Sequence, residues 1–246
     1  MKRTERHHLK ENDLAQSIIK ARAAIEARRR LLTSAALAIV AIAVIGVGFM
    51  AFRGRNDTRA EQLLGEAMIA LNARVVPVTA AAPGELPQAA TIGAVGSYST
   101  EAAKLTAALP KVKAAADAFP DTDAGITARY HYAATLSALG RHQEAIQEFD
   151  NVVSRVGAES LYGRMSRLGK ADTQMHAGQV DEAIATWKEL ASSTDEDLPK
   201  DAILMELAKA YAAKGNQEEA RKTFTQIVDE HPTSPYSAEA RAELGS

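Results

Sequence analysis

The hydrophobic pattern of the chain begins with one long uncharged run. Residues 31–52, LLTSAALAIVAIAVIGVGFMAF, contain no Asp, Glu, Lys or Arg. As an α-helix these 22 residues would extend about 33 Å, compared with roughly 30 Å for the hydrocarbon core of a bilayer. Arg30 and Arg53 bracket the run and can reach the lipid headgroups. The pattern therefore predicts a single transmembrane helix over residues 31–52, in contact with the lipid bilayer.

Two other interpretations of this run fit the sequence less well. A buried core helix usually has a shorter apolar stretch. A cleaved signal peptide has an apolar region of about 7–15 residues, a short basic stretch before it and small residues at the cleavage site. Here 30 residues precede the run, and it ends with the bulky Phe49, Met50 and Phe52. We therefore favour an uncleaved anchor.

After this run, apolar positions recur in three similar stretches. Each stretch is centred on an alanine. A small residue lies twelve positions before this alanine and a glycine lies five positions before it. An aromatic residue follows the alanine after four positions, and an aliphatic residue follows it after seven. The three sets are Ala133, Gly140, Ala145, Phe149 and Val152; Ala171, Gly178, Ala183, Trp187 and Leu190; and Ala208, Gly215, Ala220, Phe224 and Ile227. This spacing predicts antiparallel helix pairs. The small residues allow close approach, the glycine ends the first helix in a left-handed conformation, and the ring and aliphatic residue share one face of the second helix.

The region before the three stretches contains a weaker version of the pattern. Leu64 and Leu71 have first-helix spacing, so residues 53–74 are predicted to form a helix and a degenerate first repeat. Residues 75–98 contain three prolines and three glycines among many alanines. They are predicted to be a flexible insert.

The region after the third stretch predicts an end to the repeats. Pro232 is a stop for the preceding helix. Ser234 followed by Pro235 is a favourable helix start, and predicts a capping helix to about Leu244. The repeat domain with its cap would occupy residues 99–246.

Charge is distributed unevenly along the chain. Residues 1–30 hold nine Lys and Arg residues against four acids, a net of +5, so that the remainder carries −7 of the total of −2. Under the positive-inside rule, this basic tail is predicted to be cytoplasmic. Residues 53–246 would then be exported, into the periplasm of a cell with two membranes. A near-zero total charge also excludes a chain that is basic overall, and we expect no nucleic-acid partner.

The third stretch resembles the tetratricopeptide repeat family. The family pattern of small residue, aromatic, alanine, aromatic, aliphatic and proline is matched by Ala208 after Leu207, Tyr211, Ala220, Phe224, Ile227 and Pro232. The second stretch departs from it, because Gln174 replaces the first aromatic and Asp195 stands where a proline is common. The stretches are 38 and 37 residues apart, above the usual 34. The resemblance implies an all-α fold, with a single transmembrane helix followed by a tetratricopeptide-like α-solenoid of helix-turn-helix repeats.

The predicted order of basic tail, span and exported repeats is similar to YfgM-like ancillary subunits of the bacterial Sec translocon. Residues 224–236 are also similar to the last repeat of envelope proteins such as YbgF and the lipoprotein BamD. Those relatives have cleaved signals or a lipidated cysteine, and this chain has no cysteine and no convincing cleavage site. The resemblance implies a bacterial inner-membrane (plasma-membrane) protein that binds translocon partners or translocating polypeptides as a chaperone-like accessory subunit. Two alternatives remain open: an envelope-assembly or cell-division scaffold with one defined partner, and a cytoplasmic adaptor of opposite topology.

In stacked helix pairs the first helices line a concave groove. Projection of the third stretch onto the others predicts these protein-binding groove residues: Tyr130, Met165, Leu168, Asp172, Met175, His176, Met205 and Lys209. Three of the six methionines of the chain are in this set, and adaptable methionine suits varied apolar partners. Alternatively, these methionines pack between helices, which is the more usual role of methionine.

Candidate chemistry is sparse. The sequence has no His-Glu-x-x-His motif, no phosphate-binding glycine loop and no Gly-x-Ser-x-Gly motif. The histidines at 131, 142, 176 and 231 are isolated from one another along the chain. The acidic run Asp195-Glu196-Asp197 lacks the glycine and terminal glutamate of a calcium loop. We therefore expect no catalytic residues, no metal site and no cofactor, and predict that the protein is not an enzyme.

Overall fold

The computed structural model describes residues 17–23, 29–76, 97–194 and 197–245, and these are mostly helical. The helices are α2 (Arg29–Leu71), α3 (Glu101–Ala118), α4 (Asp123–Ala138), α5 (His142–Val156), α6 (Leu161–His176), α7 (Val180–Ser192), α8 (Lys200–Lys214), α9 (Gln217–Glu230) and α10 (Tyr236–Gly245). Two short strands, β1 (Arg74–Val75) and β2 (Ser97–Tyr98), pair in parallel. The predicted all-α fold class is confirmed. The structure divides into two units, residues 1–55 and 56–246.

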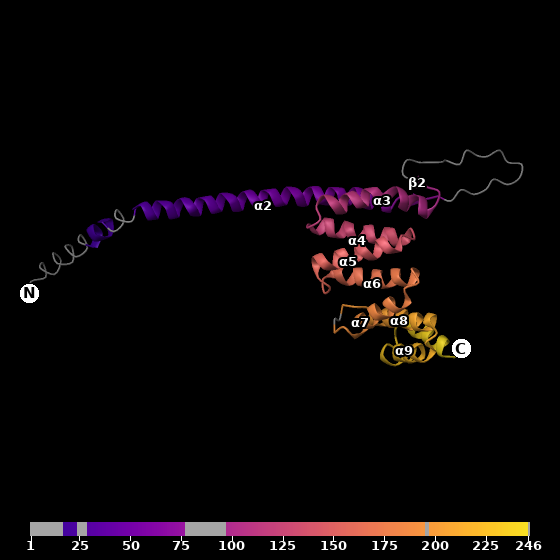
Figure 1. Ribbon diagram of the computed structural model, residues 1–246. Coiled ribbons are helices and arrows are strands. Elements are labelled where there is room, and N and C mark those ends of the chain that lie inside the picture. The colour runs from indigo at the N-terminus through magenta and orange to yellow at the C-terminus, as the bar shows by residue number, and fades with distance from the viewer. Residues whose placement is uncertain (1–16, 24–28, 77–96, 195–196, 246) are drawn as a thin grey trace, which may run out of the picture. The chain divides into compact units, whose positions relative to one another are not determined.

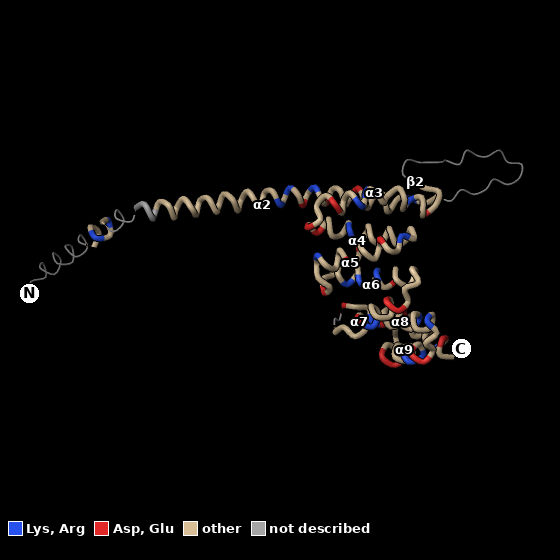
Figure 2. The backbone as a smooth tube through the Cα atoms, in the orientation of Figure 1, with Lys and Arg blue, Asp and Glu red and all other residues tan. Residues whose placement is uncertain are grey.

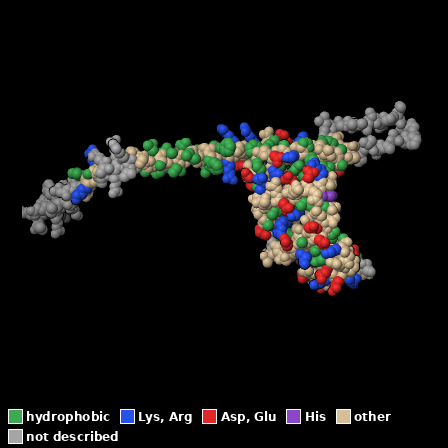
Figure 3. All heavy atoms as spheres, viewed as in Figure 1, with side chains coloured by type: hydrophobic (Ala, Val, Ile, Leu, Met, Phe, Trp, Pro, Cys, Tyr) green, Lys and Arg blue, Asp and Glu red, His purple; other side chains and the backbone are tan. Residues whose placement is uncertain are grey.

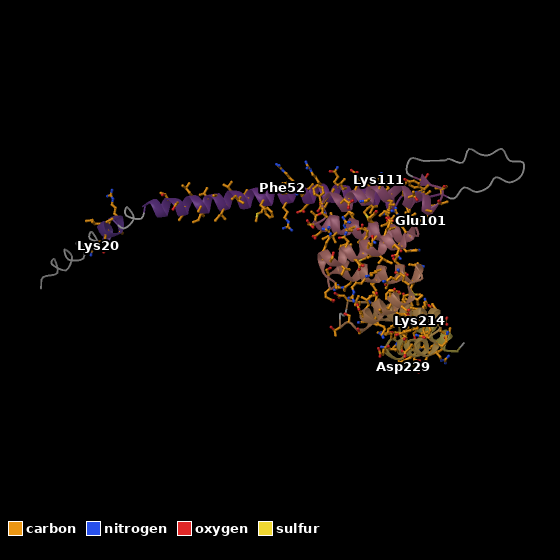
Figure 4. All side chains as sticks on the ribbon, in the orientation of Figure 1. Lys20, Phe52, Glu101, Lys111, Lys214 and Asp229 are labelled. Atoms are coloured by element: carbon orange, nitrogen blue, oxygen red, sulfur yellow. The ribbon has the colours of Figure 1, made fainter. Side chains whose placement is uncertain are left out.

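The helix α2 has 43 residues, so the predicted span and the helix predicted after it are parts of one continuous helix. Between Leu37 and Phe52 its large apolar side chains are each more than half exposed. Figure 3 shows this run of hydrophobic side chains ending at a group of basic ones, and Figure 4 labels Phe52 at its end. By length and composition, α2 is able to cross a membrane.

The three predicted helix pairs are α4 with α5, α6 with α7, and α8 with α9, and each helix packs against the next along the chain (Figure 1). Gly140, Gly178 and Gly215 follow the first helix of each pair with φ of 76°, 75° and 84°. In every pair the amide of the residue after this glycine donates to a carbonyl five residues earlier, as from Arg141 to Leu136 at 2.9 Å. This bond closes a Schellman motif, which requires the left-handed conformation. The predicted turns are confirmed.

The small residues predicted to let the helices approach are all buried. The two alanines of each pair are at most 1% exposed, and the rings and aliphatic residues that follow them at most 4%. These side chains form two hydrophobic clusters. One extends from the end of α2 to α5 and the other from α6 to α10.

The last predicted element is also present. The helix α9 ends at Glu230, before Pro232, and α10 begins at Tyr236. The Tyr236 amide donates to Oγ of Ser234 at 3.1 Å, and this hydroxyl donates to the Asp201 carboxylate at 2.7 Å. The cap is therefore tied to α8 by the residue that starts it.

The end of α2 shares a hydrophobic cluster with α3, in which Ala67 and Ala70 lie with Ala108 and Val112. The degenerate first repeat remains a prediction. The insert predicted to be flexible lies mainly at residues 77–96, outside the described residues. Before and after these residues, β1 and β2 form a parallel pair that the sequence pattern does not predict.

A buried arginine links α3 to the first regular repeat. Arg129 is 6% exposed and donates to Glu148 at 2.7 Å, to Asp117 at 2.8 Å and to the Ala116 carbonyl at 3.1 Å. Burial alone would raise the pKa of Asp117, but hydrogen bonds from Lys113 and Arg129 outweigh it and the pKa lies below its usual value. Elsewhere acidic and basic residues are interspersed over the repeats (Figure 2).

Packing at the small positions gives a test of the register. Ala183 is fully buried, whereas Ala185 on the same helix is exposed. We expect Ala183→Leu to lower the stability of the full-length protein by about 1–3 kcal/mol through overpacking. The matched Ala185→Leu should change it by less than about 0.5 kcal/mol. Thermal unfolding in detergent, followed by circular dichroism, measures both, and equal melting of the two variants would contradict the register.

Candidate functional site

A groove of about 580 Å³ lies where α4, the start of α5 and α6 meet. We call it the α4–α6 groove. Its lining residues are Tyr130, Ala134, Ser137, Ala138, Gly140, His142, Phe149, Gly169, Asp172 and His176. It contains three of the residues predicted from the repeat register: Tyr130, Asp172 and His176.

The groove is open because the facing surfaces of α4 and α6 carry small side chains. Ala134 and Ser137 on α4 and Gly169 on α6 all line the groove. Oγ of Ser137 and Oγ1 of Thr173 form a hydrogen bond of 2.8 Å between the two helices. This bond satisfies both hydroxyl groups and joins neighbouring repeats with little side-chain volume.

Phe149 from α5 forms part of the lining next to Gly169. Its ring is 2% exposed, and a Cβ atom at position 169 would lie 2.6 Å from Cζ of the ring. Real Cβ contacts of this length do not occur, so only glycine at 169 permits this ring position.

Tyr130 forms the aromatic wall of the groove. Its ring centroid lies 6.0 Å from Phe149, 5.7 Å from Tyr162 and 5.4 Å from His131. Burial, together with the neighbouring Tyr162, raises the pKa of Tyr130 above its usual value. The phenol is therefore neutral at physiological pH and offers a ring face and a hydroxyl.

Two histidines and a carboxylate supply the polar groups. The rings of His142 and His176 stack with centroids 6.2 Å apart and planes 21° from parallel. Nδ1 of His142 is buried and has no hydrogen bond within the described residues. Nε2 of His176 lies 3.6 Å from Oδ1 of Asp172.

The structure separates the other predicted groove residues from this site. Met165, Leu168 and Met175 are partly buried, and the last two pack against the second hydrophobic cluster. The assignment of Met205 to an open groove is wrong, because this residue is 0% exposed. Its helix α8 is contacted by α10 as well as by α7 and α9. Lys209 stays exposed at the surface, and pairs with Glu206 at 3.5 Å and with Glu239 of α10 at 3.1 Å.

Sequence reasoning missed His142, Phe149 and Gly169 as groove residues. Of these, Phe149 was identified only as the ring of its helix pair, His142 only as an isolated histidine, and Gly169 was not singled out. The stacking of His142 on His176 depends on how one pair packs on the next, which spacing within a repeat does not contain. The one sequence signal for the groove was Gly169, because a glycine within a helix indicates that another group approaches it closely.

This arrangement is suited to binding through shape, an aromatic surface and a single carboxylate. Within the described part of the chain, no group of three His, Cys, Asp or Glu side chains could hold a metal ion. The expected lack of a metal site, cofactor and catalytic residues remains a prediction.

Comparison with known proteins supports the helical repeat. Residues 122–241 match the family model described as a tetratricopeptide repeat-like domain, a match over 120 of the 246 residues. Two crystal structures of TPR-like repeats from a Podospora anserina protein named as a kinesin light chain are also similar. One of them, a variant, is 22% identical with a TM-score of 0.50, and the other is 21% identical with a TM-score of 0.49. Each alignment covers 57% of this chain and 76% of the other. The likeness with a TM-score of 0.50 shows the fold alone. No protein with a curated description matches the chain.

The close contact at Gly169 gives a second test. We expect Gly169→Ala to destabilise the protein by about 1–2 kcal/mol, because the displaced Phe149 ring costs more than the gain in helix propensity. The same change at Gly65, where nothing lies within 4 Å of the added Cβ, should stabilise α2 by up to about 1 kcal/mol. Opposite shifts of the melting temperature check the prediction, and stabilisation by both substitutions would refute the contact.

Proposed function

We propose that the chain is a membrane-anchored protein-binding module that catalyses no reaction. In this proposal α2 crosses the bilayer, and the α4–α6 groove binds a segment of a partner protein. The observation that carries the proposal is the groove itself, in which an aromatic wall and one carboxylate lie above small side chains between two repeats. Tetratricopeptide-like repeats support the class of partner, because stacked repeats present extended concave binding surfaces.

The membrane anchor is supported by the exposure of α2. A single large apolar side chain costs about 1.5–3 kcal/mol when it is left in water rather than buried. Ile39, Ile42, Ile45 and Phe49 are each 63–70% exposed, and others beside them are similar. A bilayer covers such a surface, and the basic residues at its end would lie among the headgroups.

The favoured specific role is a translocon-associated, chaperone-like accessory subunit with a cytoplasmic N-terminus and a periplasmic repeat domain. Tethering near the membrane would raise the effective concentration of the groove at the site where a polypeptide emerges. The similarity of the overall plan to YfgM-like subunits supports this role.

A scaffold for envelope assembly or cell division is the second candidate. One observation favours it: Met205, assigned to an adaptable methionine surface, is buried in the core. The remaining groove is compact, with polar groups at fixed positions, and such a site suits one defined partner.

Topology separates these roles from a cytoplasmic adaptor. With alkaline phosphatase fused after Ser246 we expect activity, because this reporter folds only outside the cytoplasm. Green fluorescent protein at the same position, exported unfolded, should remain dark. The reverse result would remove both envelope roles.

Deletion of residues 31–52 should release the protein from the membrane fraction, and a deletion variant that stays there would contradict the anchor.

Cross-linking in cells identifies what the groove binds. We expect a photoreactive residue at His176, on the groove rim, to give protein adducts, and one at Asp229, exposed on α9, to give far fewer (Figure 4). A spread of adducts would indicate many clients and the translocon role. One discrete adduct would indicate a scaffold. Equal yields from the two positions would refute the groove as a protein-binding site.

A further inference from the structure

One carboxylate sets the charge of the α4–α6 groove. Asp172 has a side chain that is 58% exposed, and its partner is His176, which is charged only when protonated. Among the described residues, no Lys or Arg lines the groove. Basic residues close by in sequence are held by other acids: Lys170 by Asp150 at 2.7 Å and Arg141 by Glu144 at 2.7 Å. With His176 neutral, the groove presents an uncompensated negative charge.

The equivalent position of the next repeat shows how such a residue is used. Position 209 follows position 172 by the repeat spacing of 37 residues, and it holds a lysine. This Lys209 pairs with Glu239 of α10, the segment that packs on α8. In the third repeat, the residue at this position therefore forms an ion pair with a segment that packs on the first helix of the repeat. At Asp172 the sign of the charge is reversed.

Next to Asp172, the groove offers aromatic surface. The partly exposed Tyr130 supplies this surface, and the buried Phe149 supports its ring from a centroid distance of 6.0 Å. Among the described residues the cation above a ring is Lys113 over Tyr132, at 5.8 Å, and Tyr130 has none. An aromatic face attracts both a cation and the apolar stem of a lysine or arginine.

We propose that the α4–α6 groove selects an extended polypeptide segment in which a lysine or arginine lies beside an apolar side chain. The basic group would pair with Asp172, and the apolar side chain would pack on Tyr130. Segments with an acidic residue at that place are repelled by Asp172. This inference rests on the proposed protein-binding function, and names the chemistry of the partner.

The test uses the full-length protein in detergent and fluorescein-labelled ten-residue peptides with a Gly-Ser background. The central pair is Phe-Lys in one peptide, Phe-norleucine in a second, Phe-Glu in a third and Ser-Lys in a fourth. Fluorescence anisotropy measures the Kd of each. We expect Phe-Lys to bind about two- to fivefold more tightly than Phe-norleucine, as for an exposed ion pair, and about tenfold more tightly than Phe-Glu. Ser-Lys should bind about tenfold more weakly than Phe-Lys, because it lacks the apolar anchor.

Variants assign the preference to residues. Asp172→Asn should reduce the Lys-to-norleucine ratio to less than twofold. Tyr130→Ala should weaken all three Phe peptides by about tenfold. Asp229→Asn, the same substitution on the exposed surface of α9, should change nothing. Unchanged melting curves verify that each variant is folded.

Three results would overturn the inference. The first is equal affinity for the Lys, norleucine and Glu peptides, and the second is a preference for Lys that survives Asp172→Asn. If Tyr130→Ala still loses peptide binding in either case, the groove remains a protein-binding site without charge selection. The third is failure of every peptide to bind. The cross-linking experiment then decides separately whether the proposed function also fails.

Discussion

Close contact between alanines is the constraint on which the repeats depend. Ala145 and Ala183 in the second helices are completely buried, as are their counterparts Ala133 and Ala171 in the first helices. Because alanine has no atom beyond Cβ, the helices of a pair approach closely, and the ring four residues later reaches the next pair. Phe149 reaches α6 in this way, at the position where only glycine leaves room. The groove therefore exists because the contact within each pair is so short.

The helix α2 combines two patterns that belong to different surroundings. To Phe52 its large apolar side chains are exposed on all sides, whereas from Ala60 a single face is buried. No proline interrupts the sequence between these parts, so the backbone hydrogen bonds continue from one to the other. A segment that is apolar all round suits lipid, and a segment with one apolar face suits a protein core. The change in pattern marks the end of the candidate span within a single element.

Sequence predicted what local spacing determines and missed what packing between repeats determines. The turns at Gly140, Gly178 and Gly215 follow from a steric rule that acts within one helix pair. By contrast, Tyr130, Leu168 and Met205 share one register position but differ in burial. Tyr130 and Leu168 are partly exposed, whereas Met205 is 0% exposed and lies in the hydrophobic cluster that extends from α6 to α10. The three residues share one position in the repeat, but whether a side chain at that position is exposed depends on tertiary packing.

The departure of the second repeat from the family pattern coincides with the groove. In the third repeat the first-helix position holds the buried Tyr211, whose bulk fills the space between helices. In the second repeat Gln174 takes this position, is 5% exposed and accepts a hydrogen bond from Oγ1 of Thr186 at 3.2 Å. A buried amide needs such a partner, and this bond directs it toward α7. The surface of α6 toward α4 is then left to Thr173 and Gly169, and their small size keeps the groove open. A repeat that filled these positions with large apolar residues would gain core packing and lose the space for a partner.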